Sequence, residues 1–81
     1  MRVTIRLFAR LRDLGGGGTL TRDVADDACV DTVWQALAQE FPAIAPLRTS
    51  IAVAVNAEYA KFTTRVTDGD EVAFLPPVSG G

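Results

Sequence analysis

The end of this sequence carries the one group whose type and setting predict chemistry. Glycine has no Cβ, so Gly80 and Gly81 can enter a narrow slot and leave a terminal carbonyl open to attack. The prolines before them fix φ and lack an N–H, which ends a strand and favours an extended segment. At about 3.3 Å per residue, such a tail reaches about 20 Å. We expect it to comprise Pro76, Pro77, Val78, Ser79, Gly80 and Gly81.

A terminal carboxylate must be activated before it can react, because its pKa of about 3.5 leaves it ionised and weakly electrophilic at neutral pH. Attack on the α-phosphate of ATP would give an acyl adenylate with a good leaving group. A sulfur donor would then yield a thiocarboxylate, and a lysine amine would yield an isopeptide. The sequence has no ATP-binding motif, so a separate activating enzyme would use the ATP. Gly81 is therefore expected to be the reactive end of a sulfur carrier or of a protein tag.

Other catalytic and metal chemistry is poorly supported. The sequence has no histidine, which removes Ser-His-Asp and Cys-His pairs and most zinc sites. The glycines at 15–18 lack the Lys-Ser/Thr of a phosphate-binding loop. Cys29 is interpreted as a small, partly buried residue, and Asp68, Asp70 and Glu71 as a solvated turn rather than a calcium loop. We expect no metal and no cofactor bound by this chain.

The bulk composition indicates one small domain. Its 81 residues are 48% hydrophobic, which is enough for one core, so we expect a domain at 1–75 and the tail at 76–81. A net charge of -2, with one cluster of four arginines between positions 2 and 12, argues against nucleic-acid binding. No apolar run approaches the roughly 20 residues that cross a bilayer, so membrane insertion is not expected. A single cysteine and no secretory pattern predict a cytoplasmic protein.

The first third of the sequence predicts two strands joined by a long connection. Residues 2–8 alternate, with Val3, Ile5 and Leu7 on the buried side. A short helix is expected at 9–14, followed by the glycine interruption and a weaker, polar strand at 19–25.

A helix is predicted at 32–41. Asp31 or Thr32 can cap it, and Thr32 and Gln35 have the spacing of a capping box. Pro42 stops it. Its apolar stripe comprises Val33, Trp34, Leu37, Ala38 and Phe41.

The rest of the sequence predicts further strands. A turn or short helix at 45–47 leads to the apolar run 51–56, which is typical of a central strand. An edge strand at 59–62 and a tight turn at 67–70 precede the last strand at 71–75. The order, two strands, a helix and more strands, is that of an α+β fold.

Three stretches resemble a known family: VTDGDEVAFLPPVSGG at 66–81, VAVN at 53–56 and RLFARLRDL at 6–14. Together they closely resemble the molybdopterin synthase small subunits, which are ubiquitin-like sulfur carriers. The resemblance covers most of the chain and is most specific in the last fifteen or so residues. It implies a β-grasp fold, in which a mixed sheet wraps around the main helix. The glycine loop at 15–18 departs from the pattern, being more flexible than a tight connection requires.

The resemblance also implies a reaction sequence. An ATP-dependent, E1-like enzyme would adenylate Gly81, and a sulfur donor protein would convert it to a thiocarboxylate. The tail would then enter the large synthase subunit, where the sulfur attacks a cyclic pyranopterin precursor, and two deliveries build the dithiolene of molybdopterin. The complex would be a heterotetramer with two small subunits at the ends of a large-subunit dimer. On its own, the chain would not be an enzyme.

A docking surface is predicted from side chains that fall out of phase with the core. Phe8 and Leu75 should face outward from the sheet, and Tyr59 matches a position in the family's partner-binding patch. Arg12 is expected to dock the activating enzyme. The alternative is that these apolar side chains pack under the glycine loop or a neighbouring helix.

Three other functions remain open. Carriers of the same fold serve thiamine thiazole, cysteine or transfer-RNA thiolation, and they differ only in the acceptor enzyme. A ubiquitin-like modifier would join Gly81 to lysines, and a plain interaction domain would have an inert tail. The sequence DGDEVAFLPPVSGG favours the molybdopterin branch.

Overall fold

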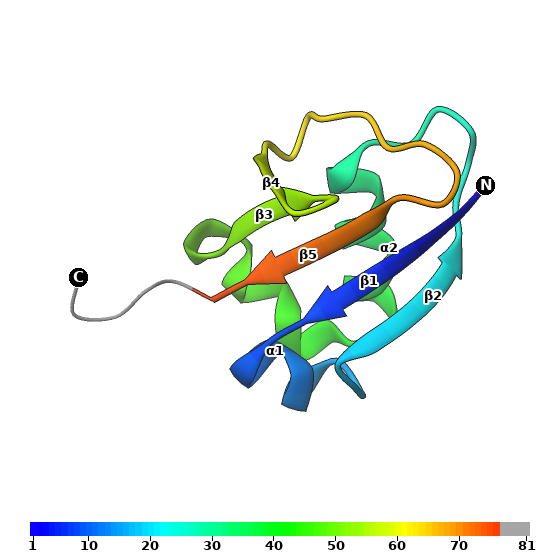
Figure 1. Ribbon diagram of the computed structural model, residues 1–81. Coiled ribbons are helices and arrows are strands. Elements are labelled where there is room, and N and C mark those ends of the chain that lie inside the picture. Colours follow the sequence, from blue (N-terminus) through cyan, green and yellow to red (C-terminus); the bar gives the residue numbers. More distant parts are fainter. Residues whose placement is uncertain (77–81) are drawn as a thin grey trace.

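The protein is a five-stranded mixed sheet with one main helix on one face (Figure 1). The computed structural model describes residues 1–76. The predicted tail residues Pro77, Val78, Ser79, Gly80 and Gly81 therefore lie outside the described part. The elements are β1 (Arg2–Leu7), α1 (Ala9–Leu14), β2 (Thr19–Asp23), α2 (Val30–Glu40), the 3₁₀ helix η1 (Pro42–Ser50), β3 (Ala52–Val55), β4 (Glu58–Ala60) and β5 (Glu71–Leu75).

The sheet has the strand order β2-β1-β5-β3-β4, which places the last strand at its centre. β1 and β5 are parallel, whereas β2 pairs antiparallel with β1, and β3 pairs antiparallel with both β5 and β4. α2 lies against one face, and the opposite face of β1, β5 and β3 is open (Figure 1). This is the α+β, β-grasp arrangement expected from the sequence. The apolar run 51–56 contains the inner strand β3, which lies next to the central strand β5.

The core lies between the sheet and α2. Alternate residues of β1 and β5 point to this side because successive side chains of a strand face opposite ways. From α2, Trp34 packs edge-on against Phe74 of β5, with ring centroids 4.9 Å apart. The fully buried large side chains are Trp34, Phe74, Ile5, Leu7, Leu11, Leu37, Ile44, Val3, Val30, Val33 and Val72.

The start of α2 corrects the predicted caps. The helix begins at Val30, and its N-cap is Cys29 rather than Asp31 or Thr32. Thr32 occupies the third helical position, where its hydroxyl accepts a hydrogen bond of 3.2 Å from the Cys29 backbone N–H. The backbone N–H groups of Val30 and Asp31 donate to carbonyls of the 62–64 segment at 2.9 Å each. Distant backbone therefore satisfies donors at the helix end, which no local pattern reveals.

Several other boundaries differ by a few residues. β1 ends at Leu7, because the next residues turn into α1 through Ala9, whose φ is 50°. β2 ends at Asp23, β4 is confined to 58–60, and η1 extends over 42–50, beyond the turn or short helix predicted at 45–47.

Two glycines of the loop at 15–18 lie close to neighbouring side chains. A Cβ on Gly15 would lie 2.5 Å from Cδ1 of the buried Leu7, and one on Gly16, whose φ is +79°, would lie 3.1 Å from the Phe41 ring. A side chain would therefore not fit at Gly15 or Gly16 without movement of these neighbours, and the expected flexibility of the loop stays a prediction. Within residues 1–76, no helix is long and apolar enough to cross a membrane.

Candidate functional site

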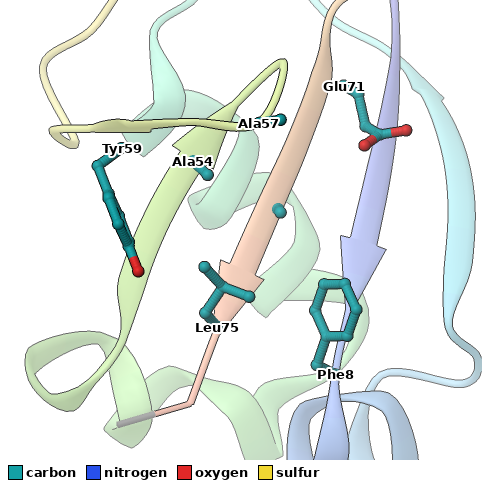
Figure 2. A pocket seen from close by; sticks show the side chains of 7 residues that line it. Phe8, Ala54, Ala57, Tyr59, Glu71 and Leu75 are labelled. Carbon is teal, nitrogen blue, oxygen red and sulfur yellow. The ribbon is translucent and has the colours of Figure 1, made fainter. Parts of the chain in front are cut away.

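The open face of the sheet contains an apolar hollow of about 300 Å³ (Figure 2). Figure 2 shows Phe8 and Tyr59 on opposite sides of it, with Leu75 between them. We call it the sheet hollow; its lining residues are Phe8, Ala54, Ala57, Tyr59, Glu71, Ala73 and Leu75.

Strand pairing explains why the surface is hollowed here. Ala54 of β3 lies opposite Ala73 of β5 and also opposite Tyr59 of β4, so these residues share one face. The two alanines leave space that larger side chains would fill. Leu75 follows Ala73 by two residues and lies on the same face. Phe8 joins them because it continues the extended chain beyond β1, with φ -126° and ψ 152°.

The large apolar side chains of the hollow are accessible to a partner. Tyr59 is 83% exposed and Phe8 is 37% exposed, and they are the exposed large hydrophobic residues of the part of the chain that is described. Leu75 is partly buried. Large apolar side chains gathered around an open hollow are typical of a protein interaction site.

A charged pair lies beside the hollow, formed by its lining residue Glu71 and the neighbouring Arg6. The Arg6 guanidinium lies 3.7 Å from the Glu71 carboxylate and 5.5 Å from the centroid of the Phe8 ring. Both charges are partly exposed, so the ion pair itself adds little stability. The stacked guanidinium instead restrains the Phe8 ring at the edge of the hollow.

The β3–β4 hairpin beside the hollow is held to the start of β5 by Asn56. The Asn56 backbone N–H donates to the Glu71 carbonyl at 2.8 Å, and the Glu71 N–H donates to Asn56 Oδ1 at 3.0 Å. Asn56 Nδ2 donates to Asp70 Oδ1 at 2.9 Å. The Thr67 backbone N–H, and then the Asn56 amide, lower the pKa of the Asp70 carboxyl. We call this set of hydrogen bonds the Asn56 clamp.

The structure brings three of the four predicted docking residues together. Phe8, Tyr59 and Leu75 all line the hollow, which excludes their packing under the glycine loop. Arg12 does not line it; this residue is exposed on α1, next to the glycine loop. Its role in docking the activating enzyme stays a prediction. Pro76 directly follows β5, at the edge of the described residues.

The sequence reasoning missed four other residues of the site. Ala54, Ala57, Ala73 and Glu71 also line the hollow. A signal for two of them was present, because Ala54 and Ala73 alternate with the core positions of their strands. Their meeting depends on the strand register, which the sequence does not display.

Cys29 lies apart from the hollow and acts as a helix cap. Its thiol is 3.5 Å from the Thr32 hydroxyl. That side-chain hydrogen bond, followed by the Thr32 backbone N–H, lowers the pKa of the thiol. Across residues 1–76, no group of three or more histidine, cysteine or acidic residues could hold a metal ion.

Comparisons with known proteins cover nearly the whole chain. The model of the ThiS family matches residues 5–81. The molybdopterin synthase sulfur carrier subunit of Escherichia coli is 37% identical over 81 residues, which cover 98% of this chain and 99% of that protein.

Solved structures agree with this match. The crystal structure of the small archaeal modifier protein 1 (SAMP1) from Haloferax volcanii has a TM-score of 0.88 and 34% identity to this chain. The match covers 100% of both chains. A chain in the complex of subunits 1 and 2 of molybdopterin-converting factor from Helicobacter pylori has a TM-score of 0.70 and 27% identity, again over 100% of both chains.

Proposed function

The chain belongs to the ThiS family, and from this premise we propose that it is the sulfur-carrier subunit of a molybdopterin synthase. It delivers sulfur as a thiocarboxylate on Gly81 to a cyclic pyranopterin precursor of the molybdenum cofactor. The observation that carries this proposal is the end-to-end similarity to a sulfur carrier subunit of that synthase. The family match continues through Gly81, which supports a role for this residue.

The chemistry at Gly81 takes place in two steps. A carboxylate oxygen attacks the α-phosphorus of ATP, pyrophosphate leaves, and an acyl adenylate forms. Sulfide (HS⁻) released by a donor protein then attacks the acyl carbon, the bond to phosphate breaks and AMP leaves, and loss of the sulfur-bound proton gives the thiocarboxylate. The E1-like activating enzyme binds the ATP, so this chain needs no cofactor of its own. The absence of a Cβ at Gly81 keeps the acyl carbon open in both steps.

The large subunit of the synthase receives the tail and supplies the remaining catalytic groups. Five residues follow Pro76, and at about 3.4 Å each they reach at most about 17 Å. Any protein that takes Gly81 into its active site must therefore stand close to the end of β5. Leu75, at that end, lines the sheet hollow, which makes the hollow the docking surface for the large subunit.

The assembled enzyme is a cytoplasmic heterotetramer, with two copies of this chain at the ends of a large-subunit dimer. The chain alone is not an enzyme in this scheme. After the sulfur of each copy has bonded to the precursor, water hydrolyses the acyl C–S bond, so the sulfur stays on the precursor and the copy leaves as a carboxylate to be activated again. Two deliveries complete the dithiolene.

A second candidate function is a protein modifier, and the similarity to SAMP1 favours it. A modifier would use the same adenylate, but a lysine amine instead of sulfur would attack Gly81. Conjugates of high mass in cells would support this function. Carriers for thiamine thiazole, cysteine or transfer-RNA thiolation would give the same thiocarboxylate and differ in the acceptor.

The decisive experiment is intact-mass analysis of the protein isolated from its own cells, paired with capture of the large subunit. We expect a free form in which one terminal oxygen is replaced by sulfur, together with a copurifying large subunit. A chain found only as lysine conjugates would favour the modifier. A thiocarboxylate without large-subunit binding would place the chain in another sulfur-transfer pathway.

A further inference from the structure

The β3–β4 hairpin turn holds an alanine in a conformation that suits glycine. Val55 pairs with Glu58, so the loop contains only Asn56 and Ala57, with φ values of 50° and 68°. Two-residue hairpin loops with positive φ at both positions strongly favour glycine at the second. An L-alanine there is strained by its Cβ, whereas asparagine tolerates the first position.

The strain at Ala57 persists because its neighbour is fixed. The Asn56 clamp joins the turn to the start of β5 through three hydrogen bonds between 2.8 and 3.0 Å. The next residue, Glu58, is bound into the β3–β4 ladder. Ala57 is thus held in the left-handed region from both sides.

The methyl group of Ala57 adds nothing evident to the fold. The residue is exposed and lies outside the core, yet it lines the sheet hollow (Figure 2). Within residues 1–76, the other alanine with positive φ is Ala9, which directly follows Phe8 at the opposite side of the hollow. Strained backbone conformations tend to cluster at functional sites. Of the two strained alanines of the described chain, Ala57 lines the sheet hollow and Ala9 adjoins its lining residue Phe8.

We infer that Ala57 is a specificity-determining contact of the docking surface, and that its methyl group is buried by the large subunit when the tail is inserted. The inference rests on the function proposed above. We choose the large subunit as the occupant because the tail is short. A protein that receives Gly81 must lie within about 17 Å of Pro76, and the apolar hollow begins at the neighbouring Leu75. The strained turn is retained for this contact, at the expense of stability.

The test is the Ala57→Gly variant of the full chain, compared with the wild type in two measurements. Relief of the strain should raise the melting temperature by roughly 3–5 °C. Loss of one buried methyl-sized group should raise the Kd for the purified large subunit about fourfold. Formation of the thiocarboxylate by the activating enzyme should be unchanged.

Gly69→Ala is the matched control. Gly69 has a φ of +86° and lies in the turn before β5, and no atom lies within 4 Å of the place that an added Cβ would take. The added methyl group therefore meets only the backbone strain. Gly69 does not line the hollow. We expect this variant to melt at a lower temperature and to bind the large subunit with the wild-type Kd. The melting temperature would then change in both variants, whereas the Kd would change only in Ala57→Gly.

Three results would overturn the inference. An unchanged Kd for Ala57→Gly would show that the methyl group is not in the interface. Weaker binding of the activating enzyme alone, measured as slower thiocarboxylate formation, would assign Ala57 to that partner. Loss of self-association in the variant would assign it to a second copy of this chain. Failure of the wild type itself to bind the large subunit would instead refute the proposed function, so the two failures are distinguishable.

Discussion

At the scale of single residues, the proposed chemistry depends on Gly81 having no Cβ. Gly81→Ala places a methyl group beside the acyl carbon, where it obstructs the narrow slot of the acceptor. We expect the melting temperature to stay at the wild-type value, because the substitution lies beyond β5. Sulfur transfer should fall by about 100-fold, the scale of loss when reacting atoms are displaced by about an ångström. Single-turnover assays with the large subunit measure this, and an unchanged rate would refute a role for Gly81.

Asp70 gives a prediction about pH. Hydrogen bonds from the Thr67 N–H and the Asn56 amide lower the pKa of this carboxyl in the folded protein. A carboxyl with a lowered folded pKa stabilises the fold above its unfolded pKa of about 3.9, and this contribution is lost as the pH falls through the folded value. Asp70→Asn should therefore reduce the free energy of unfolding at pH 7 by about 1 kcal/mol, since solvent screens a partly exposed group.

Urea denaturation at pH 7 and near pH 3 tests this expectation. The difference between Asp70→Asn and the wild type should shrink as the pH falls, because the wild-type carboxyl then becomes neutral. Asp27→Asn removes the same charge at an exposed aspartate outside the Asn56 clamp, and it should change stability little at either pH. A difference for Asp70→Asn that stays constant with pH would mean that its charge is not what stabilises the turn.

At the scale of elements, one face of the sheet forms the core and the other forms the hollow. Val72 and Phe74 of β5 pack on α2, while Ala73 and Leu75 face the hollow. Leu75→Glu should raise the Kd for the large subunit at least tenfold, because an unpaired carboxylate would be buried in an apolar interface. The fold should remain intact, since Leu75 lies outside the core.

Thr63→Glu is the control for this variant. It adds the same charge at an exposed residue that does not line the hollow, so any general effect of charge appears in both variants. A strong drop in the melting temperature of Leu75→Glu, with binding preserved, would show that Leu75 serves the fold rather than the interface.

The elements also show how much of the fold and of the site can be predicted from the sequence alone. The alternation in β1 and β5 is a local pattern, so the core positions and the outward direction of Leu75 could be predicted. The start of α2 could not, because Cys29 replaces the usual capping residues and distant backbone at 62–64 binds the helix end. Likewise, large side chains such as Phe8 and Tyr59 were recognised by phase and resemblance. The alanine floor of the hollow depends on the register between β3 and β5.

At the scale of the whole molecule, the fold places the sheet hollow next to Pro76, where the predicted tail begins. β5 is the central strand, it lines the hollow with Ala73 and Leu75, and it leads directly into Pro76. A partner bound at the hollow is therefore already close to the tail. In the proposed function, docking depends on the sheet hollow and sulfur delivery on the tail, so it should be possible to separate them.

Shortening the tail should separate binding from delivery. Deletion of Val78 and Ser79 leaves three residues after Pro76 and reduces the maximum reach from about 17 Å to about 10 Å. The sheet hollow is untouched, so the Kd for the large subunit should change by no more than a few-fold. Sulfur delivery in a single-turnover assay should be lost, because Gly81 no longer reaches the acceptor. Replacement of the same two residues by glycines keeps the length and should retain most of the delivery. If the shortened chain still delivered sulfur, the tail would not be the spacer that sets the distance between docking surface and active site.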